Sequence, residues 1–257
     1  AGIRPSFNRH SSTTHDDGRY TMVITPAGRQ MHRRSTESGL PLRWSAPFFN
    51  PSGYASEAIN FVLPLEKRST LGILHNSSIE SATFTRGLPA ADREALFRMR
   101  DRFGTLRGGI CISHGPAGFF TRLPDADYSI GRTMFETDRI APDWVAACNR
   151  MDEVWVPSQF NVETFAASGV ERSKLVVIPG AVDSEFFDPA RHTVYPLPNQ
   201  ARFNFLSIFE WSSRKGWDVL LAAYLREFSA DDDVCLWLRT YLFSKPEGDP
   251  TEEIRRR

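Results

Sequence analysis

Two apolar segments with a short helical pattern between them decide the fold: DEVWVP at residues 152–157 and KLVVIP at residues 174–179. Each is a short run of β-branched and aromatic residues that ends in proline, which is typical of a buried strand. Between them, Ser158 is a favourable N-cap and Gly169 a favourable stop for a helix. The alternation of strand, helix and strand predicts a parallel sheet with helices on both faces.

The same alternation extends toward the N-terminus. Short apolar runs predict strands over residues 42–49, 70–75 and 108–113, and helical spacing of apolar residues predicts helices over 55–63, 89–103 and 142–151. We therefore expect residues 41–200 to form a Rossmann-like α/β domain. Residues 1–40 are rich in Ser, Thr, His, Arg and Gly, and only residues 20–24 resemble a strand, so we expect a poorly ordered tail there.

A second unit follows a linker. Residues 188–202 contain three prolines and few large apolar groups. Beyond them the sequence predicts a strand over 202–209, a helix over 217–228 and a strand over 234–239. Because two strands do not make a stable doubly wound sheet, we expect residues 203–257 to be an incomplete second Rossmann-like domain, and the chain to be a piece of a longer protein.

Composition excludes several classes of protein. The 257 residues carry 31 Lys and Arg against 31 Asp and Glu, which gives no electrostatic case for nucleic acid or an anionic membrane as the main partner. Three cysteines far apart fit neither a disulfide scaffold nor a zinc site. No apolar run is long enough for a transmembrane segment, and no signal segment is evident, so the compartment stays open with the cytoplasm as the default expectation.

Ligands of open parallel sheets bind beyond the carboxyl ends of the strands, and three predicted strand ends carry suitable residues. The first is the turn at Ser52 and Gly53, where glycine lets a ligand approach the backbone and the helix start favours an anion. The turn lacks a full GxGxxG pattern, which disfavours a nicotinamide or flavin cofactor. A tight turn without a ligand is the alternative interpretation.

The second candidate is His114, which follows the apolar strand at 108–113. From a strand end its imidazole can donate a hydrogen bond to a substrate hydroxyl or phosphate, although a structural histidine is the alternative. The segment CISHG at 111–115 nearly matches the GxSxG elbow of serine hydrolases, with Asp183 and His192 later in the chain. It lacks the first glycine, and Pro and Gly residues argue against the helix that should follow Ser113, so a hydrolase is the weakest option.

The third candidate is the run Arg214, Lys215 and Gly216, where two adjacent cations precede a predicted helix. Such a turn suits a diphosphate, because point charges combine with free N–H groups. An exposed basic turn is the alternative. The triplet DAD at 125–127 fits the DxD pattern of metal-dependent sugar transferases, but no apolar strand leads into it. We therefore interpret it as an acidic turn and predict no metal site.

Several segments together resemble one family. RTMFETD (132–138), NRMDEVWVPS (149–158), SGV (168–170), IPGAVD (178–183), FLSIF (205–209) and RKGWDVLL (214–221) resemble family 4 glycosyltransferases of the GT-B fold. The resemblance covers roughly residues 42–243. It implies two facing Rossmann-like domains, an N-terminal one that holds the acceptor and a C-terminal one that holds the nucleotide sugar.

The resemblance also implies an activity, namely transfer of a hexosyl group from a nucleotide-diphosphate sugar to an acceptor hydroxyl with retention at the anomeric carbon. No metal or other cofactor is implied, because cations and helix N-termini neutralise the departing diphosphate. By position, the Ser52–Gly53 turn would approach the acceptor and the donor phosphate. His114 would contact the donor sugar, and Lys215, with Arg214 and Gly216, would hold the donor diphosphate.

The sequence departs from the family in two ways. The family usually has an arginine five residues before the lysine, whereas Glu210 stands here and would repel a phosphate. The family also has two glutamates seven residues apart, which Glu252 and Glu253 do not match. We therefore expect this fragment alone to lack the full grip on ribose and sugar, and to be inactive. The alternative function is a non-catalytic sugar-binding or protein-binding relative.

Overall fold

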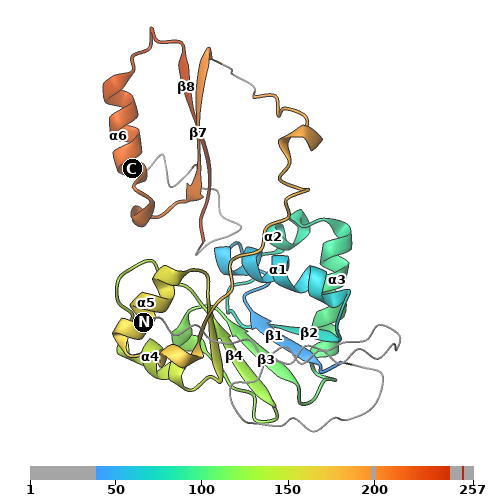
Figure 1. The fold of residues 1–257 in the computed structure, drawn as a ribbon. Coiled ribbons are helices and arrows are strands. Elements are labelled where there is room, and N and C mark those ends of the chain that lie inside the picture. The colour runs from blue at the N-terminus through green and yellow to red at the C-terminus, as the bar shows by residue number, and fades with distance from the viewer. Residues whose placement is uncertain (1–38, 198–200, 244–250, 252–257) are drawn as a thin grey trace, which may run out of the picture. The chain divides into compact units, whose positions relative to one another are not determined.

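The computed structural model describes residues 39–197, 201–243 and 251 (Figure 1). The strand expected at residues 20–24, the tail before residue 39, and Glu252 and Glu253 lie outside the described residues. Two parallel sheets are described, one of six strands and one of two. The larger sheet is interleaved with helices, which confirms the Rossmann-like α/β class predicted from the sequence.

The six-stranded sheet has the order β2-β1-β3-β4-β5-β6. Its strands are β1 (Leu42–Ala46), β2 (Leu71–His75), β3 (Ile110–His114), β4 (Tyr128–Arg132), β5 (Glu153–Val156) and β6 (Leu175–Val177). The chain steps outward from β1 to β2 and then continues on the other side of β1 with β3. The direction of winding therefore reverses between β1 and β3.

The helices between these strands are α1 (Gly53–Glu66), α2 (Ala82–Gly87), α3 (Ala90–Phe103), α4 (Pro142–Asn149) and α5 (Gln159–Ser168). Short 3-10 turns are η1 (Ala117–Phe119), η2 (Arg172–Lys174) and η3 (Pro189–Arg191). The caps predicted for α5 are confirmed: the Ser158 side chain accepts a hydrogen bond from the Asn161 amide, and Gly169 ends the helix with a left-handed φ of 111°.

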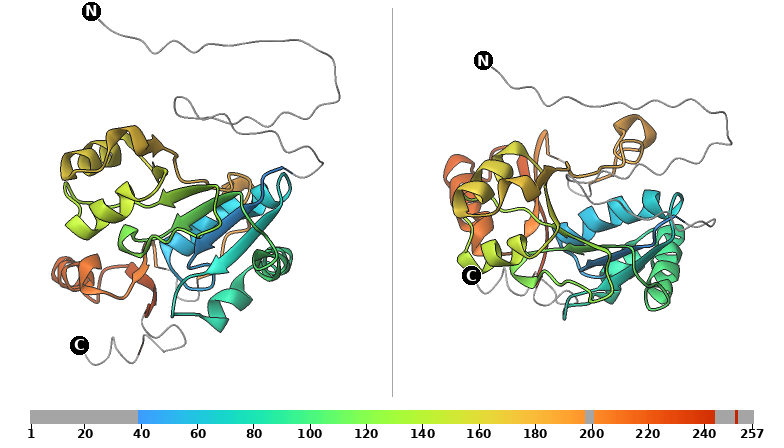
Figure 2. Two further views of the ribbon diagram at one scale, coloured as in Figure 1. Left: turned by 90° about the horizontal axis from the view of Figure 1, so that it is seen from below. Right: turned by 60° about the horizontal axis from the view of Figure 1, so that its bottom comes forward.

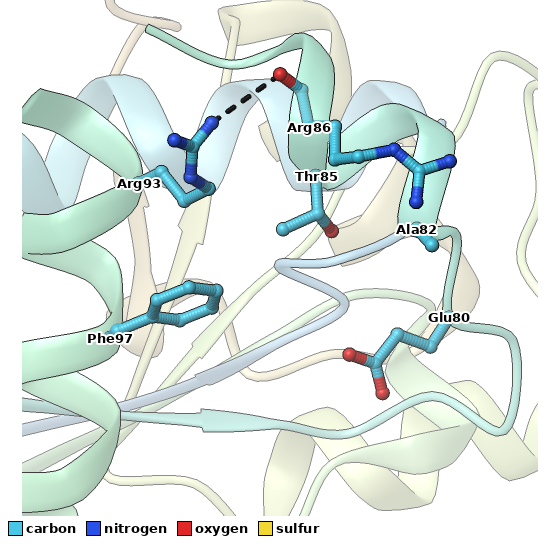
Figure 3. A pocket seen from close by; sticks show the side chains of 6 residues that line it. All are labelled: Glu80, Ala82, Thr85, Arg86, Arg93 and Phe97. Carbon is cyan, nitrogen blue, oxygen red and sulfur yellow. Dashed lines mark hydrogen bonds between the residues drawn. The ribbon is translucent and has the colours of Figure 1, made fainter. Parts of the chain in front are cut away.

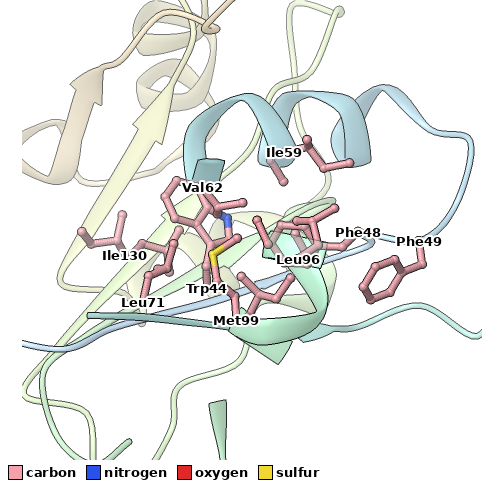
Figure 4. Close-up of a cluster of buried hydrophobic side chains, with 14 residues drawn as sticks. Trp44, Phe48, Phe49, Ile59, Val62, Leu71, Leu96, Met99 and Ile130 are labelled. Carbon is pink, nitrogen blue, oxygen red and sulfur yellow. The ribbon is translucent and has the colours of Figure 1, made fainter. Parts of the chain in front are cut away.

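Side chains alternate between the two faces of each strand, and helices cover both faces as predicted. The indole of Trp44 in β1 stacks on the Phe61 ring of α1 with 5.6 Å between centroids, which places α1 on that face. Figure 4 shows the buried cluster there, which includes Trp44, Phe48, Ile59, Val62, Leu71, Leu96, Met99 and Ile130. On the opposite face, Val154 and Val156 of β5 pack with residues of η1, α4 and α5. Each large side chain buried in this way contributes roughly 1.5–3 kcal/mol.

Two elements of this sheet domain are not predicted by the sequence. The strand β4 has the sequence YSIGR, which is too polar to be recognised as a buried strand. Gly131 is needed there because a Cβ at this position would lie only 2.2 Å from the Phe120 ring. The helix α2 buries no residue and is marked only by its N-cap Ser81, whose hydroxyl accepts from the Phe84 amide at 3.0 Å.

The second sheet pairs β7 (Phe203–Glu210) with β8 (Val234–Tyr241) in parallel, with η4 (Ser213–Lys215) and α6 (Trp217–Glu227) between them. Tyr224 of α6 packs on Phe205 of β7 with 6.1 Å between ring centroids. The predicted strand, helix and strand are therefore confirmed. Within the described ranges, no helix combines the length and the apolar character needed to cross a bilayer.

Candidate functional site

The sheet order brings two of the three predicted strand ends next to each other. In open parallel sheets the crevice for a ligand lies where the winding direction reverses, outside the carboxyl ends of the strands. Here that point lies between β1 and β3. The Ser52–Gly53 turn follows β1, and His114 is the last residue of β3. The two further views in Figure 2 show the strands of this sheet side by side. Topology alone therefore makes this edge the candidate site of the larger sheet.

Ser52 and Gly53 have different roles in their turn. The Ser52 side chain caps α1 and accepts a hydrogen bond from the Ala55 amide at 3.1 Å. Gly53 is exposed, and a Cβ added to it would meet nothing within 4 Å. No hydrogen bond from the Gly53 or Tyr54 amide to another described residue is present. The turn thus joins a structural cap to an open helix start that suits an anion.

His114 is fully buried, and both of its ring nitrogens already have partners. Trp44 Nε1 lies 3.3 Å from Nδ1, and Nε2 lies 2.8 Å from a Glu57 carboxylate oxygen. Because an indole nitrogen can only donate, Nδ1 accepts and the ring is the neutral tautomer with its proton on Nε2. Burial also lowers the pKa of His114, which favours this neutral form. The predicted contact with a donor sugar therefore requires one of these hydrogen bonds to be exchanged.

Glu57 and Arg132 complete this network. Arg132 ends β4, is fully buried, and pairs with the Glu57 carboxylate. Its guanidinium also donates to the Ile178 carbonyl and lies 5.2 Å from the centre of the Phe61 ring. Burial by itself raises the pKa of Glu57, but hydrogen bonds from His114 and Arg132 outweigh it and lower the pKa to about 2. The Glu57 carboxylate is thus ionised and links the ends of β3 and β4.

Neither Glu57 nor Arg132 was predicted from the sequence to lie in the site. Arg132 was missed with its strand, since β4 has no apolar run. The signal for Glu57 is its spacing: it follows Tyr54 by three residues and precedes Phe61 by four, so it shares their helix face. Tyr54 confirms that this face points inward, because its ring packs on His114 and its hydroxyl donates to the Met134 carbonyl at 3.2 Å.

The third predicted site lies at the carboxyl end of β7. Arg214 and Lys215 are exposed in η4, and no ion pair links either one to another described residue. Gly216 adopts a left-handed conformation with φ 65° and stands at the N-cap of α6, without a side chain to cap the helix. Glu210 ends β7 four residues before the first of these cations. The turn therefore offers free positive charge and an uncapped helix start.

The acidic triplet has a structural role. Asp125 pairs with the Arg43 guanidinium at 3.0 Å, and an Asp127 oxygen accepts from the Gly109 amide at 2.7 Å. Both precede β4, so they lie at the amino end of the strands, opposite the candidate site. In the part of the chain that the structure describes, no cluster of three His, Cys, Asp or Glu side chains could hold a metal ion.

The serine hydrolase option is not supported by the geometry. Ser113 is buried and its hydroxyl accepts from the Thr121 amide at 3.2 Å. The strand is followed by the 3-10 turn η1 and not by the helix that a nucleophile elbow requires. Asp183 accepts from amides of its own turn, and His192 bonds to the Phe186 carbonyl.

Compared with known proteins, the chain matches no protein-family model and no curated protein.

Proposed function

We propose that this protein is a glycosyltransferase that moves a hexosyl group from a nucleotide-diphosphate sugar to an acceptor hydroxyl, with retention at the anomeric carbon. The observation that carries the proposal is the turn at Arg214 and Lys215, where two exposed cations lie between a parallel strand and an uncapped helix start. A departing diphosphate is stabilised by that combination of fixed charge and free N–H groups. The resemblance to family 4 glycosyltransferases supports the retention of configuration.

The six-stranded sheet supports an acceptor site. Its winding reverses between β1 and β3, where the exposed Gly53 turn stands beside the end of β3. In the proposed reaction the anomeric carbon loses its bond to a diphosphate oxygen and gains one to the acceptor oxygen. The hydroxyl proton of the acceptor leaves with the diphosphate. Glu57 and Arg132 act as positioning residues, since they hold the ends of β3 and β4 and the His114 tautomer.

Diphosphate binding tests the proposal. Affinities of the chain for uridine and guanosine diphosphates are measured by calorimetry, with inorganic pyrophosphate as the probe without base and ribose. Lys215→Ala removes one charge-assisted contact and is expected to weaken binding by roughly 1.5–3 kcal/mol. Lys67→Ala, which removes an exposed lysine after α1, is the matched control. Unchanged affinity in Lys215→Ala would overturn the role given to the turn.

A second candidate function, a non-catalytic sugar-binding protein, is favoured by Glu210. Its carboxylate ends the strand that leads into the basic turn, where it opposes an anion. Glu210→Gln distinguishes the two functions because it removes that repulsion. If the turn binds a diphosphate, this variant binds uridine diphosphate more tightly than the parent chain. If the protein binds only sugars, a neutral sugar binds and Glu210→Gln leaves nucleotide affinity unchanged.

A further inference from the structure

A pocket of about 560 Å³ lies beside α2 and α3 (Figure 3). It is lined by Glu80, Ala82, Thr85, Arg86, Arg93 and Phe97. These residues come from the segment after β2, from α2 and from α3. None of them was predicted from the sequence to have a functional role.

The pocket is joined to the candidate site through the loop after β1. The Ser81 amide donates to the Phe49 carbonyl at 2.8 Å, and the Phe49 ring lies 5.8 Å from the Phe97 ring. Phe49 precedes the Gly53 turn by four residues, and β2 is the neighbour of β1. A ligand in the pocket therefore lies at the same carboxyl edge of the sheet as that turn.

Two guanidinium groups at this pocket have donors to spare. Arg93 donates from Nη1 to the carbonyls of Arg86 and Leu88, each at 3.4 Å, and Arg86 donates from Nη2 to the Thr83 hydroxyl at 3.3 Å. Neither forms an ion pair with a carboxylate of the described residues, in contrast to the buried Arg132. The remaining N–H groups suit the planar oxygens of a phosphate or carboxylate.

The other residues that line the pocket determine which kind of molecule can carry the anionic group. Figure 3 shows Phe97 of α3 and Glu80 on different sides of the pocket, with Thr85 between them. The Arg100 guanidinium lies over the Phe97 ring, 4.7 Å from its centre, and the part of the ring that lines the pocket offers an apolar contact for the C–H groups of a sugar. The exposed Glu80 carboxylate accepts hydrogen bonds from hydroxyls and repels a second anionic group. The lining thus matches a hydroxylated ring with one anionic substituent.

We propose that this pocket binds a sugar that carries a single phosphate or carboxylate, and that such a molecule is the acceptor. The naming of the acceptor rests on the proposed function, whereas binding to the pocket does not. Arg86 holds the anionic group, and Arg93 supports the end of α2 through its bonds to the Arg86 and Leu88 carbonyls. Glu80 accepts from ring hydroxyls, and Phe97 supplies an apolar contact to the ring.

The test measures binding to the full chain without any nucleotide, with glucose 6-phosphate and glucuronate as the two anionic sugars. Methyl glucoside is the probe without charge and inorganic phosphate the probe without a ring. At least one anionic sugar is expected to bind about tenfold more tightly than either simple probe. Arg86→Ala is expected to weaken that binding about tenfold, which corresponds to about 1.4 kcal/mol.

Arg68→Ala is the matched control, because Arg68 is an exposed arginine after α1 and its loss changes the net charge equally. Arg86→Gln repeats the test with a neutral side chain that keeps more of the arginine stem, in case Arg86→Ala disturbs α2. Equal effects of Arg86→Ala and Arg68→Ala, or anionic sugars that bind no better than methyl glucoside, would overturn the proposal. If neither inorganic pyrophosphate nor a nucleoside diphosphate binds while the sugars bind at Arg86, the transferase is refuted and the pocket stands. The reverse result refutes the pocket alone.

Discussion

The two sheets differ in whether the charged side chains at their strand ends are buried and paired or exposed and unpaired. At the ends of β3 and β4, Arg132 is fully buried and pairs with the nearly buried Glu57. At the end of β7, Arg214 and Lys215 are exposed and pair with no described carboxylate. A buried pair that satisfies itself fixes the shape of the fold, whereas unpaired exposed cations are free to meet an anion. The first region is thus expected to govern stability and the second to govern binding.

Glu57→Gln gives the largest expected effect. It leaves the Arg132 charge buried without its counterion, so we expect the free energy of unfolding to fall by about 3–5 kcal/mol. Lys215→Ala, at the exposed turn, is expected to change it by no more than about 0.5 kcal/mol. Urea unfolding of both variants measures the contrast.

The control is the double variant Glu57→Gln with Arg132→Met, in which neither charge remains. It is expected to recover part of the stability lost in Glu57→Gln, because the uncompensated charge is gone. Equal stability of Glu57→Gln and the parent chain would remove the distinction between the two regions.

Acid should destabilise the buried network in two stages. His114 has a folded pKa below its usual 6.5, so the unfolded chain takes up its proton first and stability falls as the pH drops below about 6.5. Glu57 has a folded pKa of about 2 against its usual 4.5, so its contribution is present above pH 4.5 and is lost as the pH falls toward 2. That difference corresponds to roughly 3 kcal/mol.

Thermal unfolding as a function of pH measures both stages. Glu57→Gln is expected to lose the stage below pH 4.5, because the titrating carboxyl is absent. A variant with the same acid dependence as the parent chain would show that other carboxyl groups cause it.

The fold was more predictable than the site. Strands such as β3 and β5 are apolar runs, so the sequence carries their signal locally. The position of His114 at a strand end was predictable for the same reason, but its burial was not. Its partners Trp44 and Glu57 lie 70 and 57 residues away in the sequence, and only the pairing of β1 with β3 and the packing of α1 bring them together. The exposed basic turn at Lys215 depends on local sequence, and the prediction placed it correctly between strand and helix.

The smallest expected effects on stability are those of Ser52, which caps a helix, and of its neighbour Gly53. Ser52→Ala removes the cap of α1 and should cost about 1 kcal/mol. Gly53→Ala fills open space at the first helical residue, so stability should stay the same or rise by up to about 1 kcal/mol. Thermal unfolding of the two variants and the parent chain measures these differences in stability. A loss of stability in Gly53→Ala would mean that the turn needs glycine for the fold and is not left open for a ligand.

The most direct test of the transferase is to locate the bound diphosphate. The isotopically labelled chain is titrated with uridine diphosphate while backbone amide resonances are followed by NMR. We predict that the largest shifts fall on residues 213–217, and that Lys215→Ala suppresses them while Lys67→Ala does not. Shifts that leave this turn untouched, or that persist unchanged in Lys215→Ala, would contradict a diphosphate site at the end of β7.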